Sequence, residues 1–318
     1  MNPPKKRIDW EYKRILKEKI DDEILLEDKY KELSKIEFIE LYEPSLWEYL
    51  CNIYSYDNNS SIKILKTSEI NKIKEKIEKD EEINKLLTYP KTFLETDIEI
   101  GEHYISKIDN FETQNYLRLW YVTFKNANYL FGFNQQKSYI ATIKENIYIY
   151  NDLIIIRGQS NKLPNIKDAF LIDFDLDKDK IIDITSQIDL MDIFDKLKEQ
   201  DQVDITTSEL TKENPISSIP AHCITFSQPL EDNDLEEFDE DDETAKLINN
   251  AENLAKSYNY CFVDTSGYKE CATISIAKNN KNIRVLRKIS DIALLALAQA
   301  LNGVYDELQQ NISDISNS

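Results

Sequence analysis

The feature that most constrains the fold of this chain is a series of short β-rich runs in its middle. The runs are rich in β-branched and aromatic residues, and most are separated by two to five polar residues. Short strands with tight polar turns are typical of an antiparallel meander. The sequence therefore predicts a curled sheet or a barrel over residues 89–210. The predicted strands cover residues 116–124, 129–133, 139–143, 147–150, 153–157, 169–174 and 181–184.

Amphipathic helices are predicted before this sheet, within residues 1–88. Apolar residues recur at spacings of three and four in residues 5–35 and again in residues 68–87. Another helix is predicted to begin at Pro44, since proline is tolerated in the first turn. The predicted fold class is α+β, with the N-terminal helices packed on the antiparallel meander. The residues expected to share one core between helices and sheet are Trp120, Phe124, Ile149 and Ile155.

Composition excludes several classes of protein. The formal net charge of −20 disfavours a general surface for nucleic acid or for anionic membranes. The five glycines never gather in one window, which argues against a Gly-rich phosphate loop of the P-loop or Rossmann type. No apolar run reaches membrane-spanning length. We expect no cofactor and no membrane partner.

The few cysteines and histidines argue against a zinc site. Cys51, Cys223, Cys261 and Cys271 form no C-x-x-C motif, and the chain has two histidines. The first residues have no apolar core behind them, unlike a signal peptide. We therefore expect an intracellular protein, cytoplasmic or nuclear, with reduced thiols.

A row of aspartates raises one catalytic alternative. Asp173, Asp175, Asp177 and Asp179 alternate with other residues, and on a strand this spacing places the carboxylates on one face, where a hard cation binds. A metal-dependent enzyme using these ligands is one hypothesis, and a solvated strand end is the other. The run is no calcium loop, because its sixth position lacks glycine and its twelfth lacks glutamate. No base and nucleophile are paired in the sequence, so we predict no catalytic residue.

Tyrosines along the predicted strands raise a further alternative, because aromatic side chains on a sheet can stack nucleic-acid bases. Few basic residues accompany them, Arg118 and Lys137 among them. Since tyrosine also suits strands, we expect these side chains to pack in the core or on the sheet surface.

An acidic block separates the last part of the chain from the rest. Ten of the thirteen residues 231–243 are acidic, and such a block repels itself and stays disordered. With the proline-containing stretch before it, this block predicts a linker over residues 211–243. The linker is either a solubilising spacer or an acidic tether that binds a basic partner or imitates nucleic-acid charge.

Residues 244–310 are predicted to form a small unit of their own, followed by a tail over residues 311–318. A helix is predicted first, then three strands, then a long helix capped by Ser290 and Asp291. The predicted ranges are 245–256, 258–264, 271–277, 282–286 and 292–308.

This α-β-β-β-α order resembles the double-stranded RNA-binding domain. The run Leu-Ile-Asn-Asn at residues 247–250 is similar to the family's Leu-Leu-Asn-Glu, and residues 260–267 and 272–276 are similar to its first two strands. The alanines that would pack the second helix on the sheet are Ala293, Ala296, Ala298 and Ala300.

The residues with which that family binds RNA are less well matched. The second helix of the family opens with Lys-Lys-x-Ala-Lys, whereas residues 289–293 here include Asp291, which repels phosphate. Members that lose these residues serve as protein-binding or dimerisation modules, so the resemblance implies a non-catalytic adaptor or complex subunit that binds a protein or a second copy of itself. The alternative is double-stranded RNA binding through a basic cluster, which consists of Lys278, Lys281, Arg284, Arg287 and Lys288.

Overall fold

The computed structural model describes most of the chain. The described residues are 2–21, 33–56, 60–94, 98–130, 136–187, 189–199, 204–213, 223–227, 252–278 and 281–316. The acidic block at residues 231–243 and the run 247–250 lie outside them. None of the helices within these ranges is long and apolar enough to cross a membrane.

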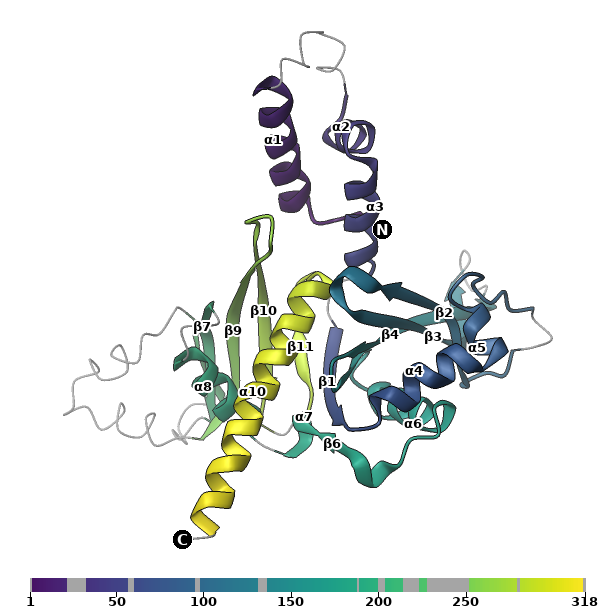
Figure 1. The fold of residues 1–318 in the computed structure, drawn as a ribbon. Coiled ribbons are helices and arrows are strands. Elements are labelled where there is room, and N and C mark those ends of the chain that lie inside the picture. Colours follow the sequence, from purple (N-terminus) through teal and green to yellow (C-terminus); the bar gives the residue numbers. More distant parts are fainter. Residues whose placement is uncertain are drawn as a thin grey trace.

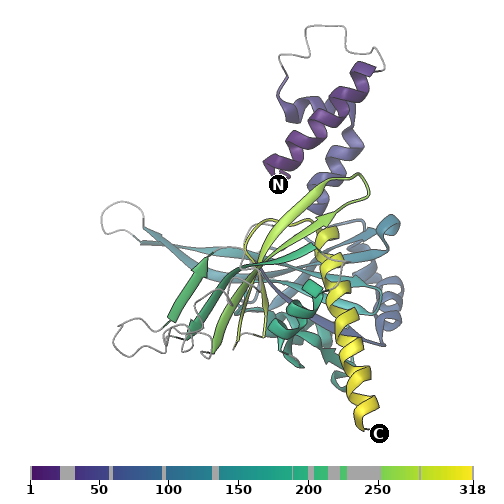
Figure 2. The same cartoon turned by 90° about the vertical axis from the view of Figure 1, so that its left-hand side faces the viewer.

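The first helices form an arm that projects from one end of the molecule (Figures 1 and 2). The arm consists of α1 (Lys5–Asp21), α2 (Lys35–Tyr42) and α3 (Pro44–Ile53). Ser34 caps α2 in a capping box with Glu37. Ile15, Phe38 and Ile39 form a small core of their own between α1 and α2. The α3 helix begins at Pro44, as the sequence predicts.

All strands of the described chain join in one antiparallel sheet, which is open. Its order is β2-β3-β4-β5-β1-β11-β10-β9-β7-β8, and β6 pairs with the end of β1. The strands are β1 (Ser60–Thr67), β2 (His103–Phe111), β3 (Tyr116–Leu130), β4 (Gln136–Tyr150), β5 (Leu153–Gly158), β6 (Ile181–Asp183), β7 (Asp204–Glu213), β8 (Cys223–Ser227), β9 (Asn253–Val263), β10 (Lys269–Ala277) and β11 (Ile283–Val285).

The centre of this sheet is β1, a strand that the sequence analysis did not predict. One edge of β1 pairs with β5 and the other with β11. Because β11 hydrogen-bonds to β1, the strands of residues 253–285 continue the sheet of the central region.

Helices cover opposite faces of the two halves of the sheet, since alternate residues of the strands pack in two separate cores. The α4 (Ile70–Lys79), α5 (Glu81–Lys85) and α6 (Leu163–Asp173) helices lie on one face of the half formed by β1 to β5. The long α10 helix (Asp291–Ser316) and α8 (Leu190–Glu199) lie on the other face, across β9, β10 and β11. Short α7 (Ile184–Gln187), η3 (Glu112–Gln114) and η4 (Lys178–Lys180) complete the elements.

The α+β class and the antiparallel sheet are confirmed, but the expected shared core is wrong. Ile149 faces α4 and α6, whereas Ile155 faces α10. Phe124 is buried away from both of these clusters, and Trp120 is half-buried. The reason is that β4 and β5 carry apolar side chains on both faces, so neighbouring strands contribute to two cores.

Two local predictions fail for different reasons. Residues 169–174, predicted as a strand, lie mostly in α6, which begins with Pro164 in its first turn and buries Leu163, Ile166, Phe170 and Leu171 at helical spacing. Residues 253–256, predicted as the end of a helix, instead form the start of β9. There β7 and β10 satisfy the backbone on both sides, and tertiary pairing overrides the local pattern.

Candidate functional site

One face of β7, β9, β10 and β11 is a candidate for binding. It is the face opposite α8 and α10, and we call it the bare face. Paired residues align in rows across it: Glu209 pairs with Ser257, Ser257 with Ser275, and Ser275 with Arg284. The uncharged side chains of the bare face include Thr206, Thr211, Ala255, Ser257, Asn259, Cys261, Val263, Cys271, Thr273, Ser275 and Ala277; apart from Ser257, all of these are exposed or half-buried.

The centre of the bare face carries no charge, although 31% of the chain is charged. Charged groups stand only at its borders. Glu209 and Arg284 flank the central row, which continues to Ser227 of β8 on one side and to Ser61 of β1 on the other. Lys269 binds Asp204 at 2.6 Å at one end of the face. Solvated sheet faces usually carry charged side chains, and depletion of charge marks the centres of protein interfaces. The bare face therefore has the charge pattern of a surface that another molecule covers.

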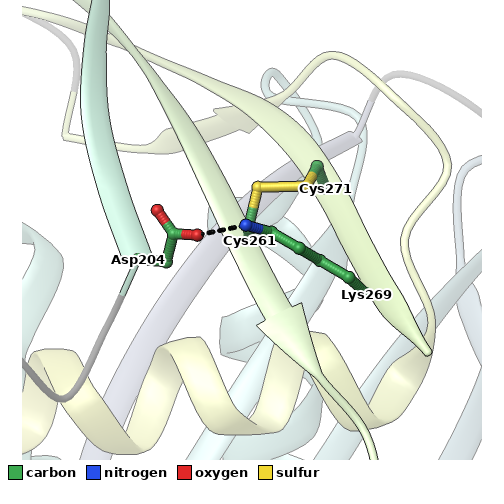
Figure 3. Close-up of a disulfide and its surroundings, with 4 residues drawn as sticks. All are labelled: Asp204, Cys261, Lys269 and Cys271. Carbon is green, nitrogen blue, oxygen red and sulfur yellow. Dashed lines mark hydrogen bonds and ion pairs between the residues drawn. A yellow bond between two sulfur atoms is a disulfide. The ribbon is translucent and has the colours of Figure 1, made fainter. Parts of the chain in front are cut away.

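A disulfide lies on this face, close to the Lys269–Asp204 ion pair (Figure 3). Cys261 and Cys271 are directly opposite each other on β9 and β10, with their Cα atoms 4.1 Å apart. The expectation of reduced thiols is therefore wrong for this pair, because pairing of the two strands brings the sulfurs together. Cys51 and Cys223 are free.

The structure spreads the five residues of the basic cluster around β11. Arg284 lies on the bare face, and Lys281 and Arg287 are exposed on either side of the strand; none of these three forms an ion pair within the described residues. Lys278 pairs with Glu252, and Lys288 donates a hydrogen bond to the Asn2 carbonyl oxygen at 3.1 Å.

The aspartate row is not a row in the structure. Asp173 ends α6 and accepts a hydrogen bond from the Tyr121 hydroxyl at 2.9 Å. Asp175 has a φ of 52° and an exposed side chain, while Asp177 caps η4 by accepting from the Asp179 amide. The predicted strand is a helix end followed by a 3₁₀ turn, which points the carboxylates in different directions. Within the described ranges, no three Asp, Glu, His or Cys side chains are placed to hold a metal ion.

A buried ionic cluster that no local sequence pattern indicates holds the start of α10 against the sheet. Asp291 is fully buried and binds Arg118 of β3 at 2.6 Å. It also accepts a hydrogen bond from the Tyr148 hydroxyl at 2.8 Å, and Arg157 lies 3.8 Å away. The Arg118 guanidinium continues to Asp109 at 2.7 Å. The predicted cap is present as well, since Ser290 Oγ accepts from the Ala293 amide. Asp291 is thus a structural residue, and it does not face solvent.

A second buried acid lies under α6 without such partners. Glu145 of β4 is 1% exposed, and neither carboxylate oxygen has a hydrogen bond of normal geometry. Burial raises the pKa of Glu145 to about 7, while nearby Lys162 and the Gln159 backbone amide lower it. Gly158 makes room for this side chain, because a Cβ there would lie 2.6 Å from Glu145 Cγ.

No protein-family model matches this chain, and a search among curated proteins finds no match. Any assignment of function therefore depends on the surfaces described above.

Proposed function

We propose that this protein is a non-catalytic subunit of a protein complex and that it binds its partner with the bare face. The observation that carries this proposal is the uncharged centre of that face in a chain of net charge −20. Packing of α8 and α10 on the opposite face leaves these side chains open to a partner.

The chemistry of the bare face defines its partner. Its small side chains on β9 and β10 leave room for larger aromatic or aliphatic side chains from the other protein, the type that dominates binding energy at interface centres. Arg284, Lys281 and Arg287 at the β11 border favour carboxylates on that side of the partner. We therefore expect a protein whose contact surface is apolar at its centre and acidic along one border.

The resemblance of residues 244–310 to the double-stranded RNA-binding domain supports the same proposal. Strands β9, β10 and β11 followed by α10 keep the last four elements of that order, whereas residues 253–256 of its first helix belong to β9. Ser290 and Asp291 stand where RNA-binding members have lysines, and both are buried. The helix start thus offers no cation to a phosphate, which favours a protein partner.

The test is a pull-down from source cells with the full-length protein and nuclease treatment, using matched variants. Asn259→Arg places a large cation on the bare face, and Asn161→Arg makes the same change at an exposed position outside it. We expect a protein that wild type and Asn161→Arg retain and Asn259→Arg loses. Equal retention by both variants, or loss of the partner on nuclease treatment, would contradict the proposal.

A second copy of the chain is the alternative protein partner. Sedimentation velocity of the three proteins distinguishes it, because a dimer that Asn259→Arg converts to a monomer identifies the bare face as a homodimer interface.

Binding of double-stranded RNA remains a second candidate, favoured by one observation. Lys281, Arg284 and Arg287 are exposed, and in the described part of the chain none has an ion-pair partner. Duplex RNA is recognised through phosphates and 2′-hydroxyls, so its affinity depends on such cations and on salt. Titration of a duplex of about 20 base pairs at about 150 mM salt tests this function. Sub-micromolar affinity that is abolished by Arg284→Glu with Arg287→Glu would replace the first proposal with this one.

A further inference from the structure

A cleft of about 480 Å³ lies on the other half of the sheet, between residues 90–94 and the outer parts of β2, β3 and β4. We call it the lysine cleft. Its walls include Phe93, Trp120 and Phe124, together with Lys91, Lys107 and Lys144. Small-molecule sites in proteins have volumes of roughly 300–1,000 Å³, so the cleft is large enough for a ligand.

The aromatic side chains that line the lysine cleft are held in place by packing. The Phe93 ring centroid lies 5.2 Å from that of Phe124 and 5.4 Å from that of Tyr104. The backbone amide of Lys91 donates to the Ser106 carbonyl oxygen at 2.7 Å, which fastens residues 90–94 to β2. Trp120 is half-buried, and its indole N–H donates to Asp109 at 2.6 Å. The ring of Trp120 is therefore held in place while part of it stays accessible.

The charge of the lysine cleft is opposite to that of the whole chain. Three lysines line it, and no carboxylate does among the described residues. Lys107 is engaged with Asp109 at 2.6 Å. Lys91 and Lys144 are exposed and have no ion pair within the described ranges; the Lys91 ammonium lies 5.4 Å from the Phe93 ring centroid. Two exposed cations beside aromatic rings suit an anion that carries a planar ring.

We propose that the lysine cleft binds a nucleotide, with the base against the Trp120 and Phe93 rings and the phosphate at Lys91 and Lys144. The Thr142 hydroxyl, exposed on the same wall, is available to the sugar or the base edge. A free mononucleotide is favoured over a nucleic-acid strand, because a net charge of −20 repels a polyanion more strongly than a single phosphate. This site is on a different half of the sheet from the bare face, so it does not depend on the proposed protein docking.

The test is isothermal titration of the full-length protein with adenosine monophosphate, uridine monophosphate, adenosine and inorganic phosphate. We expect at least one monophosphate to bind, and adenosine and phosphate to bind about tenfold more weakly or not at all, a difference of about 1.4 kcal/mol. Quenching of Trp120 fluorescence, lost in Trp120→Phe, locates the ligand, since Trp10 and Trp47 lie on the arm.

Matched charge reversals test the site itself. Lys144→Glu changes an exposed lysine of the cleft, whereas Lys125→Glu changes an exposed lysine of β3 on the opposite face of the sheet. We expect Lys144→Glu to weaken nucleotide binding about tenfold or more and Lys125→Glu to leave it within about twofold. The proposal would be overturned if both variants bound the nucleotide equally or if neither monophosphate bound. It would also be overturned if phosphate bound as strongly as the monophosphates. If a single-stranded oligonucleotide competes for the same site with higher affinity, the cleft still binds a base and a phosphate. The ligand is then a nucleic-acid strand and not a free mononucleotide.

Discussion

The two halves of the sheet differ most on one continuous face. On β3, β4 and β5 this face carries Leu119, Ile147, Ile154 and Ile156, which are buried beneath α4 and α6. On β9, β10 and β11 the same face is the bare face. The change occurs at β1, where Ser61 pairs with Gly158 on one side and with Arg284 on the other. Hydrogen bonding of the strands is thus the same in both halves, and the covering helices decide whether a strand needs apolar residues on this face.

Buried acids show a similar contrast between the regions that α10 and α6 cover. Asp291 under α10 has Arg118, Arg157 and Tyr148 as partners, whereas Glu145 under α6 has none of normal geometry. Removing one member of a buried ion pair leaves an uncompensated charge, while neutralising an unpaired buried acid relieves one. The Asp291 cluster holds α10 in place, whereas Glu145 destabilises the fold whenever its carboxyl is ionised.

The largest expected effect concerns the half of the sheet that α4 and α6 cover. Phe170 of α6 is fully buried and packs 4.9 Å from Phe174 and 6.4 Å from Tyr121, measured between ring centroids. Phe170→Ala should lower the free energy of unfolding by about 3–5 kcal/mol, because it leaves a cavity. Thr273→Ala on the bare face should change it by no more than about 0.5 kcal/mol. Urea unfolding of both variants measures the difference. A comparable loss for Thr273→Ala would mean that the bare face is packed within the folded chain.

The second prediction concerns the pH dependence that Glu145 imparts. Its folded pKa of about 7 lies above the value of 4.5 expected for an unperturbed carboxyl, so its contribution to stability is largest at low pH and is lost as pH rises from about 4.5 to 7. Glu145→Gln removes the ionisation and should stabilise the protein at pH 8 by up to about 3 kcal/mol, with little change near pH 4. Unfolding curves at the two pH values measure it.

An exposed glutamate provides the control for this variant. Glu102→Gln should change stability little at either pH, since Glu102 is solvated. Equal effects of Glu145→Gln at pH 4 and pH 8 would show that Glu145 is not protonated in the folded protein at neutral pH.

The smallest of the three effects concerns the disulfide on the bare face. Cys261 and Cys271 are ten residues apart, so their disulfide closes a short loop. Replacing both with serine should cost about 2 kcal/mol, through greater freedom of the unfolded chain. Replacing the free Cys51 and Cys223 with serine should cost clearly less. Thermal unfolding of both double variants, with and without reductant, measures this; no difference between them would show that the disulfide contributes nothing to stability.

Local patterns predicted several elements well. The start of α3 at Pro44, the serine cap of α10 and most of the β-rich run from residue 116 to 157 follow from proline, capping and β-propensity signals that act over a few residues. The strand predicted at residues 169–174 failed because a short apolar run fits a strand and a buried helix equally. Pro164 was the local signal that favours the helix.

The candidate sites were harder to predict than the elements. Arg284 was identified from its charge, and its position on the bare face follows from strand alternation once β11 is placed. The lysine cleft had no local signal, because Lys91 and Phe93 come from a connecting segment while Trp120, Phe124 and Lys144 come from two strands. Three of the tyrosines on the predicted strands, Tyr116, Tyr121 and Tyr148, are buried in the cores. Packing in the core or on the sheet surface was expected for them.

The sequence by itself determined the α+β class, the antiparallel pairing of the middle strands and the amphipathic helices, because each depends on periodicity within one element. Only the tertiary structure decided that β1 joins the two halves, that residues 253–256 form a strand, and that Asp291 is buried against Arg118, 173 positions away in the chain. These features arise between distant segments, and their free energy comes from pairing and burial that no single segment can achieve alone.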